Sequence, residues 1–322
     1  MNLLRPNTER RLVSGVGDLF VKHSTYIIRQ TNSTENSTCA VNVVKGNMAL
    51  KYNWIFVGSR PEIIKMWPFT KYIGFKFVWI NQSKDLKQDL IDFDYEIEEN
   101  ELKQFITENR DDINVLFCQG DTRSAFYSAV YGYENHIPIA HIEAGMRTGD
   151  IYNPFCEEGY RRMIDQISTY KYCSTPEAVK NCNGIYVGQT SIDTLVEFLP
   201  DVIEEDFYIV TIHRNESWGK MPQIIATLKK MNQEKLVIFA HPNKVGQELK
   251  KHFKTREPLP YKAFVGLLAR AKGCISDSGG LQEECLFLGK EFISLRDKSE
   301  RGHGETYKAG ATKKIMEYLN EI

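Results

Sequence analysis

A repeated change of pattern that begins at Lys51 most limits what this chain of 322 residues can fold into. From there on, short runs of β-branched and aromatic residues alternate with amphipathic segments of helical length. Strands are predicted at 52–57, 75–80, 114–118, 138–143, 170–174, 184–187, 207–211, 236–240, 273–276 and 291–295. Helices are predicted at 98–109, 122–133, 157–167, 221–231, 245–253, 261–270 and 280–288. Repeated β-α units predict an α/β fold with mostly parallel sheets and helices on both faces.

The segment 198–206 divides these units into two sets, because a proline and several acidic residues interrupt the pattern there. We therefore predict two Rossmann-like domains, at 51–200 and 201–322, with the C-terminal helix of the second shortened. Residues 1–50 are polar and show no such alternation, so we expect an accessory or disordered extension. In folds of this kind ligands bind beyond the carboxyl ends of the strands.

Charge and cysteine content exclude several classes of protein. The 41 Lys and Arg residues balance the 42 Asp and Glu residues, so a nucleic-acid partner bound through bulk positive charge is not expected. No apolar run approaches the roughly 20 residues that span a bilayer, so no membrane partner is expected. The seven cysteines are scattered and lack zinc-site spacing, which favours reduced thiols in a cytoplasmic protein without a metal.

Polar residues follow the strands predicted in the first half. Arg60 lies in a Gly-Ser-Arg-Pro turn whose free N–H groups favour an anion, although an ordinary strand-to-helix turn is an open alternative. Asp121 follows 114–118 and is either a functional carboxylate or a helix N-cap. Glu143 ends an apolar strand, where capping does not explain it. Glu157 and Glu158 open a helix, whose positive end also favours them on structural grounds.

The second half supplies groups suited to phosphates. His213 follows the strand at 207–211, and small residues at 278–280 open a helix whose N–H groups can reach a phosphate. Arg296 and Arg301 add positive charge after the last strand. Carboxylates in one half and phosphate-binding groups in the other are what a nucleotide-sugar enzyme needs. A Walker A sequence and a Gly-x-Gly-x-x-Gly turn after a strand are both missing, which argues against a kinase or a dinucleotide reductase.

These segments resemble the non-hydrolysing UDP-N-acetylglucosamine 2-epimerase family. The motifs that carry the resemblance are GSRPEIIKMWP (58–68), GDT (120–122), HIEAGMRTGDIYNPFCEEGYRR (141–162), IYVGQTSID (185–193), TIHRNES (211–217), AFV (263–265), DSGGLQEECLFLGK (277–290) and LRDKSER (295–301). They follow the family's order over about 51–301. The resemblance implies a glycosyltransferase-B-like fold with the active site in the cleft between the two domains.

The resemblance also implies a reaction and the residues for it. UDP-GlcNAc and UDP-ManNAc would interconvert by elimination of UDP and its re-addition to a glycal, without a cofactor or metal. By motif position the acid–base residues would be Asp121, Glu143, Glu157 and His213. The substrate-binding residues would be Arg60, Lys65, Arg161, Phe264, Ser278, Gly279, Gly280, Glu284 and Arg301.

Other functions on the same fold stay open at this point. A hydrolysing epimerase or a UDP-sugar glycosyltransferase would use the same nucleotide site, because fold alone does not decide the reaction. A degenerate UDP-sugar-binding protein is the non-enzymatic alternative. The partner expected is a UDP-sugar, and a homodimer is compatible with the sequence.

Overall fold

The computed structural model describes residues 19–22, 25–28, 51–82, 90–296 and 307–320. The chain divides into two compact units, Met1–Ala49 and Leu50–Ile322. In the first unit, strands β1 (Leu19–Lys22) and β2 (Thr25–Ile28) form an antiparallel pair. Most of the extension expected at 1–50 lies outside the described residues.

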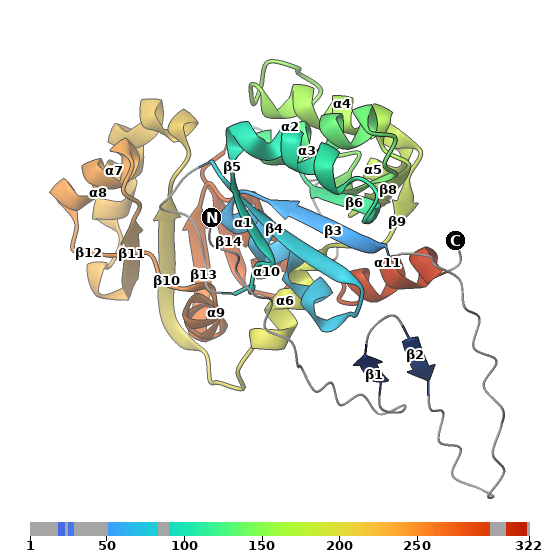
Figure 1. Cartoon of the computed structure of the whole chain (residues 1–322). Helices are drawn as coiled ribbons and strands as arrows, with labels where there is room; N and C mark the ends of the chain where they lie inside the picture. The colour runs from blue at the N-terminus through green and yellow to red at the C-terminus, as the bar shows by residue number, and fades with distance from the viewer. Residues whose placement is uncertain (1–18, 23–24, 29–50, 83–89, 297–306, 321–322) are drawn as a thin grey trace, which may run out of the picture. The chain divides into compact units, whose positions relative to one another are not determined.

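The second unit contains a parallel sheet built from its first half (Figure 1). The strand order is β5-β4-β3-β6-β7-β8-β9. These strands are β3 (Tyr52–Val57), β4 (Phe75–Asn81), β5 (Tyr95–Glu98), β6 (Ile113–Gln119), β7 (Ile139–Ala144), β8 (Tyr170–Cys173) and β9 (Ile185–Tyr186). The helices in this part are α1 (Arg60–Met66), α2 (Leu102–Asn109), α3 (Arg123–Glu134), α4 (Glu157–Ile167), α5 (Pro176–Cys182) and α6 (Thr190–Phe198), with short 3-10 turns η1 (Trp67–Lys71) and η2 (Glu99–Glu101).

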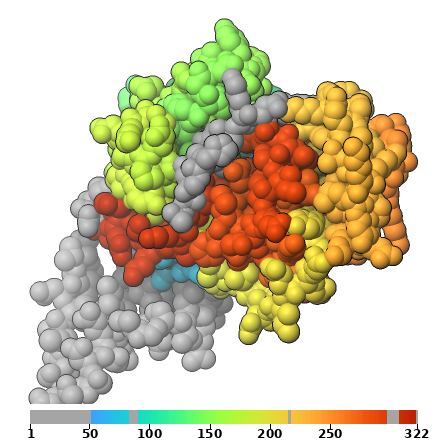
Figure 2. Space-filling model, turned by 180° about the vertical axis from the view of Figure 1, so that it is seen from behind, coloured from blue at the N-terminus to red at the C-terminus, as the bar shows by residue number. Residues whose placement is uncertain are grey.

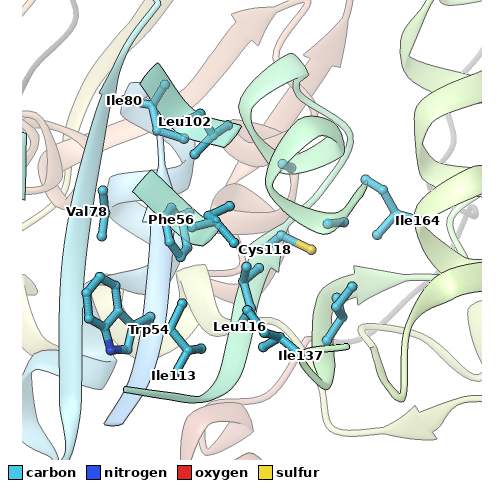
Figure 3. Packing of buried hydrophobic residues seen from close by; sticks show 14 of the residues in the cluster. Trp54, Phe56, Val78, Ile80, Leu102, Ile113, Leu116, Cys118, Ile137 and Ile164 are labelled. Carbon is cyan, nitrogen blue, oxygen red and sulfur yellow. The ribbon is translucent and has the colours of Figure 1, made fainter. Parts of the chain in front are cut away.

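Burial on both faces explains why strand β3 reads as one apolar run. Trp54 and Phe56 point into a core cluster on one face, together with residues of β4, β6 and α2 (Figure 3). Ile55 and Val57 point into a second cluster on the opposite face. A central strand of a parallel sheet is covered on both sides, so its side chains do not alternate between apolar and polar.

A second parallel sheet follows in the chain, with the strand order β12-β11-β10-β13-β14. These strands are β10 (Glu205–Ile212), β11 (Leu236–Ala240), β12 (Thr255–Arg256), β13 (Ala271–Ser276) and β14 (Glu291–Ser294). The helical segments are η3 (Asn215–Lys220), α7 (Met221–Lys230), η4 (Gln233–Lys235), α8 (Lys244–His252), α9 (Tyr261–Arg270), α10 (Gly279–Phe287) and α11 (Ala311–Asn320). The two parallel sheets confirm the predicted α/β class.

Each sheet has a point where the strand order reverses. In the first sheet β3 pairs with both β4 and β6, and in the second β10 pairs with both β11 and β13. Loops that leave the carboxyl ends of neighbouring strands diverge at such a point and leave a crevice there. The segments that begin at Gly58, Gly120, His213 and Asp277 all start at these strand ends.

Helix α11 belongs to the core of the first sheet, although it comes last in the chain. Its Ile315 is fully buried in the cluster that contains Ile55 and Phe117. Figure 2 shows α11, in red, at the surface against the yellow-green segments. The domain boundaries at 200 and 201 stay a prediction. In the part of the chain that the structure describes, no helix is long and apolar enough to cross a membrane.

The predicted element bounds agree closely with the structure. The strands at 52–57 and 236–240 and the helices at 157–167 and 261–270 have the bounds predicted from the sequence. The helix expected at 98–109 is shorter, because β5 ends at Glu98 and a 3-10 turn precedes α2. Strands β5 and β12 and helices α5 and α6 were not among the predicted elements, whereas α11 is the C-terminal helix that was expected.

Candidate active site

A cavity of about 510 Å³ is lined by residues that follow strands of both sheets. Seven of the predicted site residues line it: Arg60, Lys65, His213, Phe264, Ser278, Gly280 and Glu284. Other lining residues are Thr211, Phe239, His241, Pro242, Asn243, Leu259, Tyr261 and Leu281. The structure therefore brings two of the predicted cations, Arg60 and Lys65, and the predicted phosphate-binding turn to one cavity.

Arg60 opens helix α1 directly after the β3 turn. Pro61 is in the first turn, where the fixed φ of proline suits a helix start. The guanidinium donates a hydrogen bond from Nη2 to the carbonyl of Leu259 at 2.7 Å, which holds it at the cavity. Burial lowers the pKa of Arg60, against the opposing effect of the Glu284 charge. An arginine on the wall of a cavity is well placed to contact an anionic ligand.

Glu284 is a buried carboxylate on helix α10 that faces the same cavity. Its Oε1 accepts a hydrogen bond from the hydroxyl of Tyr261 at 2.7 Å. Burial raises the pKa of Glu284 to about 7, with a contribution from the neighbouring Glu283 and opposition from Tyr261 and Arg60. This carboxyl group therefore changes charge near neutral pH.

His213 is held in place by Asp277, a fully buried carboxylate at the end of β13. Asp277 accepts hydrogen bonds from the backbone N–H of His213 at 3.2 Å and of Arg214 at 2.9 Å, and from the Ser217 hydroxyl at 2.7 Å. The Nδ1 atom of His213 lies 3.4 Å from Asp277 Oδ1. The carboxylate thus holds the backbone at the end of β10 and lies close to the ring.

His241 lies beside His213, with the ring centroids 5.1 Å apart. Burial, together with the nearby His213 and Arg60, lowers the pKa of His241 to about 4. The ring is therefore neutral at physiological pH and adds no charge beside Arg60. A neutral imidazole can still donate or accept one hydrogen bond to a ligand in the cavity.

The small residues at 278–280 begin helix α10, as predicted. Ser278 is its N-cap, and its hydroxyl accepts from the N–H of Leu281 at 3.4 Å. A side chain added at Gly280 would meet no atom within 4 Å, so this turn faces open space. Gly279 is buried and does not line the cavity, while Ser278 and Gly280 do. The open N-terminus is an anion-binding arrangement.

Asp121 is paired with Arg161 and does not cap the helix that follows it. The N-cap of α3 is Thr122, whose hydroxyl accepts from the N–H of Ala125 at 3.1 Å. Arg161 is buried on α4 and donates from Nε to Asp121 Oδ2 at 3.0 Å. Asp121 is therefore not the N-cap of α3.

Glu143 is buried at the end of β7 and surrounded by donors. It forms an ion pair with Lys65 and accepts hydrogen bonds from the side-chain amides of Gln119 and Gln189, the latter at 3.4 Å. Its backbone adopts a φ of 68°, which is uncommon outside glycine and is typical of functional turns. Lys65 also lines the cavity, so the ion pair connects Glu143 with it.

The two glutamates that open α4 have different surroundings. Glu158 is fully buried and accepts from the Thr148 N–H at 3.1 Å and from Arg162 at 2.9 Å, so its role is structural. Glu157 is half-buried, and its Oε2 is buried without a hydrogen-bond partner among the described residues. A buried carboxylate oxygen without a donor suits a group that meets a substrate.

Five of the predicted residues that the structure describes do not line the cavity: Gly279, Asp121, Glu143, Glu157 and Arg161. The last four lie at the carboxyl ends of the first sheet's strands and on α4. Arg301 falls outside the described residues. Within 51–82, 90–296 and 307–320, no cluster of His, Cys, Asp and Glu is arranged to hold a metal ion.

Several residues at the cavity have no predicted role. His241 and Asn243 directly follow strand β11, so inspection of every strand end would have found them. Asp277 is part of the motif at 277–290, but its contact with His213 requires the pairing of β10 with β13. Tyr261 begins α9 and carries no sequence signal for its bond to Glu284.

Comparison with known proteins identifies the family. The family model for UDP-N-acetylglucosamine 2-epimerase matches residues 100–315. The chain belongs to this family. A UDP-N-acetylglucosamine 2-epimerase of Bacillus subtilis is 30% identical over 308 residues, which cover 79% of this chain and 81% of that protein. One from Campylobacter jejuni is 28% identical over 329 residues, covering 81% of this chain and 85% of that protein.

Solved structures of the family share the fold. The structure of UDP-GlcNAc 2-epimerase from Neisseria meningitidis bound to UDP-GlcNAc has a TM-score of 0.69 and 25% identity, covering 84% of this chain and 91% of that one. The Methanocaldococcus jannaschii enzyme in complex with UDP-GlcNAc and UDP has a TM-score of 0.65 and 24% identity, with coverages of 84% and 92%. The expected glycosyltransferase-B-like fold is confirmed.

Proposed function

We propose that the chain interconverts UDP-GlcNAc and UDP-ManNAc by elimination and re-addition of UDP. The observation that carries the proposal is the Lys65–Glu143 ion pair. It connects Glu143, the buried carboxylate at the end of β7, to a cavity that the second sheet lines with phosphate-binding groups. Membership of the family supports the same reaction.

The second sheet would hold the nucleotide. Backbone N–H groups at Gly279 and Gly280 and the hydroxyl of Ser278 would donate to the diphosphate, since the Ser278 N–H donates to Ser276 Oγ at 3.0 Å. Arg60 and Arg301 would be the cationic partners. Glu284 would accept hydrogen bonds from the ribose hydroxyls. Phe264 would line the uracil pocket, and its ring packs against that of Phe239 with centroids 6.2 Å apart.

The first sheet would act on the sugar. A carboxylate takes the proton from C2, the C1–O bond breaks with its electron pair leaving on UDP, and a C1=C2 double bond forms. UDP then re-adds at C1 while a carboxylic acid returns a proton to the other face of C2. Asp121, Glu143 and Glu157 are the groups proposed for these transfers, with Arg161 and Lys65 beside the first two.

His213 would assist at the diphosphate or the glycosidic oxygen, where negative charge develops as UDP leaves. His213 lines the cavity from the end of β10, and Asp277 accepts from its backbone N–H. A positioned donor at a developing charge lowers the barrier of such a step.

Incubation with UDP-GlcNAc in D2O, followed by NMR, tests the reaction. We expect deuterium at C2 and the appearance of UDP-ManNAc, because elimination exchanges the C2 hydrogen with solvent. Free ManNAc together with UDP would instead indicate the hydrolysing alternative. An absence of exchange at C2 at every enzyme concentration would rule out both and favour a UDP-sugar-binding protein.

The raised pKa of Glu284 predicts a pH dependence of nucleotide binding. Only the ionised carboxylate accepts hydrogen bonds from both ribose hydroxyls, and with a pKa of about 7 its ionised fraction rises about tenfold between pH 6 and pH 8. The affinity for UDP should therefore rise about tenfold over this range through Glu284 alone. Titration calorimetry with the wild type and Glu284→Gln measures the affinity for UDP at each pH. The variant shows how much of the pH dependence comes from the titration of UDP itself. An equal pH dependence in both proteins would contradict the prediction.

A further inference from the structure

Two buried titratable side chains, His141 and Asp165, have no part in the proposed proton transfers. His141 is fully buried on β7, and Asp165 is 1% exposed on α4. His141 Nδ1 lies 2.7 Å from Asp165 Oδ1, and its Nε2 lies 2.7 Å from the carbonyl oxygen of Gly120. Both ring nitrogens lie within hydrogen-bond distance of an oxygen atom, so the ring bridges α4 to the turn that carries Asp121.

Asp165 also holds a second turn. Its Oδ2 accepts from the N–H of Gly145 at 3.2 Å and from Arg147 at 2.6 Å. Burial alone would raise the pKa of Asp165, but the bonds and charges of His141 and Arg147 lower it below its ordinary value. An ionised Asp165 thus contacts His141, which reaches the Gly120 carbonyl, and accepts from Gly145 and Arg147 of the second turn.

The two turns connect directly to the proposed acid–base residues. Gly120, with a φ of 70°, precedes Asp121, and Gly145, with a φ of 80°, follows Glu143 and Ala144. Glu143 itself has a φ of 68°, and such a conformation in a residue with a side chain persists only where its surroundings hold it.

Helix α4 holds the Asp121 turn at two points. Arg161 contacts the Asp121 side chain, and Asp165, one helical turn further on, reaches the Gly120 carbonyl through His141. The same helix begins at Glu157. All three proposed carboxylates are therefore tied to one helix.

We propose that Asp165 and His141 are positioning residues that set the turns of Asp121 and Glu143 relative to α4. This inference rests on the proposed function, because it assigns the two turns to proton transfer at C2. Neither residue lines the nucleotide cavity, so the effect of losing them should fall on the chemical step.

The Asp165→Asn variant tests the proposal, because it keeps the shape of the side chain and removes its charge. The amide group of asparagine would face a donor, so at least one turn loses its acceptor. We expect kcat for C2 exchange to fall about 100-fold, as for a misplacement of roughly 1 Å. The Kd for UDP should stay within about threefold, because the cavity is untouched. His141→Gln should show the same split between kcat and Kd.

Ile164→Val is the matched control, since it removes one methyl group from the buried core on the same helix and changes no polar group. It should keep both kcat and the Kd for UDP. If Asp165→Asn keeps wild-type kcat, or loses kcat and UDP affinity in parallel, the proposal is overturned.

Amide hydrogen exchange supplies a readout that does not depend on activity. In Asp165→Asn, the peptides that cover 119–122 and 143–148 should exchange faster, while those of β10 stay unchanged. Should the wild type show no C2 exchange, the proposed function fails, and this measurement alone decides whether Asp165 holds the turns. Unchanged protection in both peptides would overturn that claim as well.

Discussion

In the Asp121→Asn variant the rate of deuterium exchange at C2 should fall about a thousandfold, while the protein still binds UDP. An amide has nearly the same shape as a carboxylate but cannot take up a proton near neutral pH. The proton transfer therefore loses its acceptor. Arg161, which donates to Asp121 Oδ2, can still donate to an amide oxygen, so we expect the fold to persist. Exchange by NMR and UDP affinity by calorimetry, on the same preparation, measure the two effects.

A second aspartate provides the control for this experiment. Asp111 lies at the turn before β6 with its side chain 96% exposed. Asp111→Asn removes the same charge from the same part of the chain and should exchange C2 at the wild-type rate. If Asp121→Asn also keeps wild-type exchange, Asp121 is not part of the mechanism.

The Gly145→Ala variant should be destabilised by about 3 kcal/mol or more. Gly145 has a φ of 80°, which disfavours any residue with a side chain. An added Cβ would also lie 2.1 Å from the carbonyl oxygen of Ala178, so the backbone of α5 would have to move. Urea unfolding measures the change in the free energy of unfolding.

Gly149 offers a matched comparison. Its φ of 82° is nearly the same, but an added Cβ would meet no atom within 4 Å. Gly149→Ala should therefore lose only the conformational contribution, about 1–2 kcal/mol. Equal losses in the two variants would show that the contact with Ala178 is relieved at little cost, contrary to our expectation.

The larger elements of the fold could be predicted because their patterns are local. Helix α4 has polar and apolar residues at helical spacing, and β3 is an apolar run bounded by a Gly-Ser turn. The bounds of both elements can therefore be predicted from the sequence. Strand β12 has only two residues. So short a strand exists only through its pairing with β11, and the sequence pattern does not record it.

Part of the candidate site could also be predicted from the sequence. Strand ends pointed to Asp121, Glu143 and His213, since parallel strands bring their carboxyl ends to one edge. The orienting groups were not predictable in this way. Asp277 and Asp165 act on residues 64 and 24 positions away, respectively, and only the sheet pairing and the packing of α4 create those contacts.

The sequence by itself determined the α/β class, the order of its units and the residue types at the strand ends. These follow from periodicity and turn chemistry, which act over a few residues. Only the tertiary structure decided that α11 completes the core of the first sheet, that Lys65 pairs with Glu143, and that His241 stays neutral. Such properties depend on burial and on charges brought close from distant parts of the chain, and a local pattern contains no information about either.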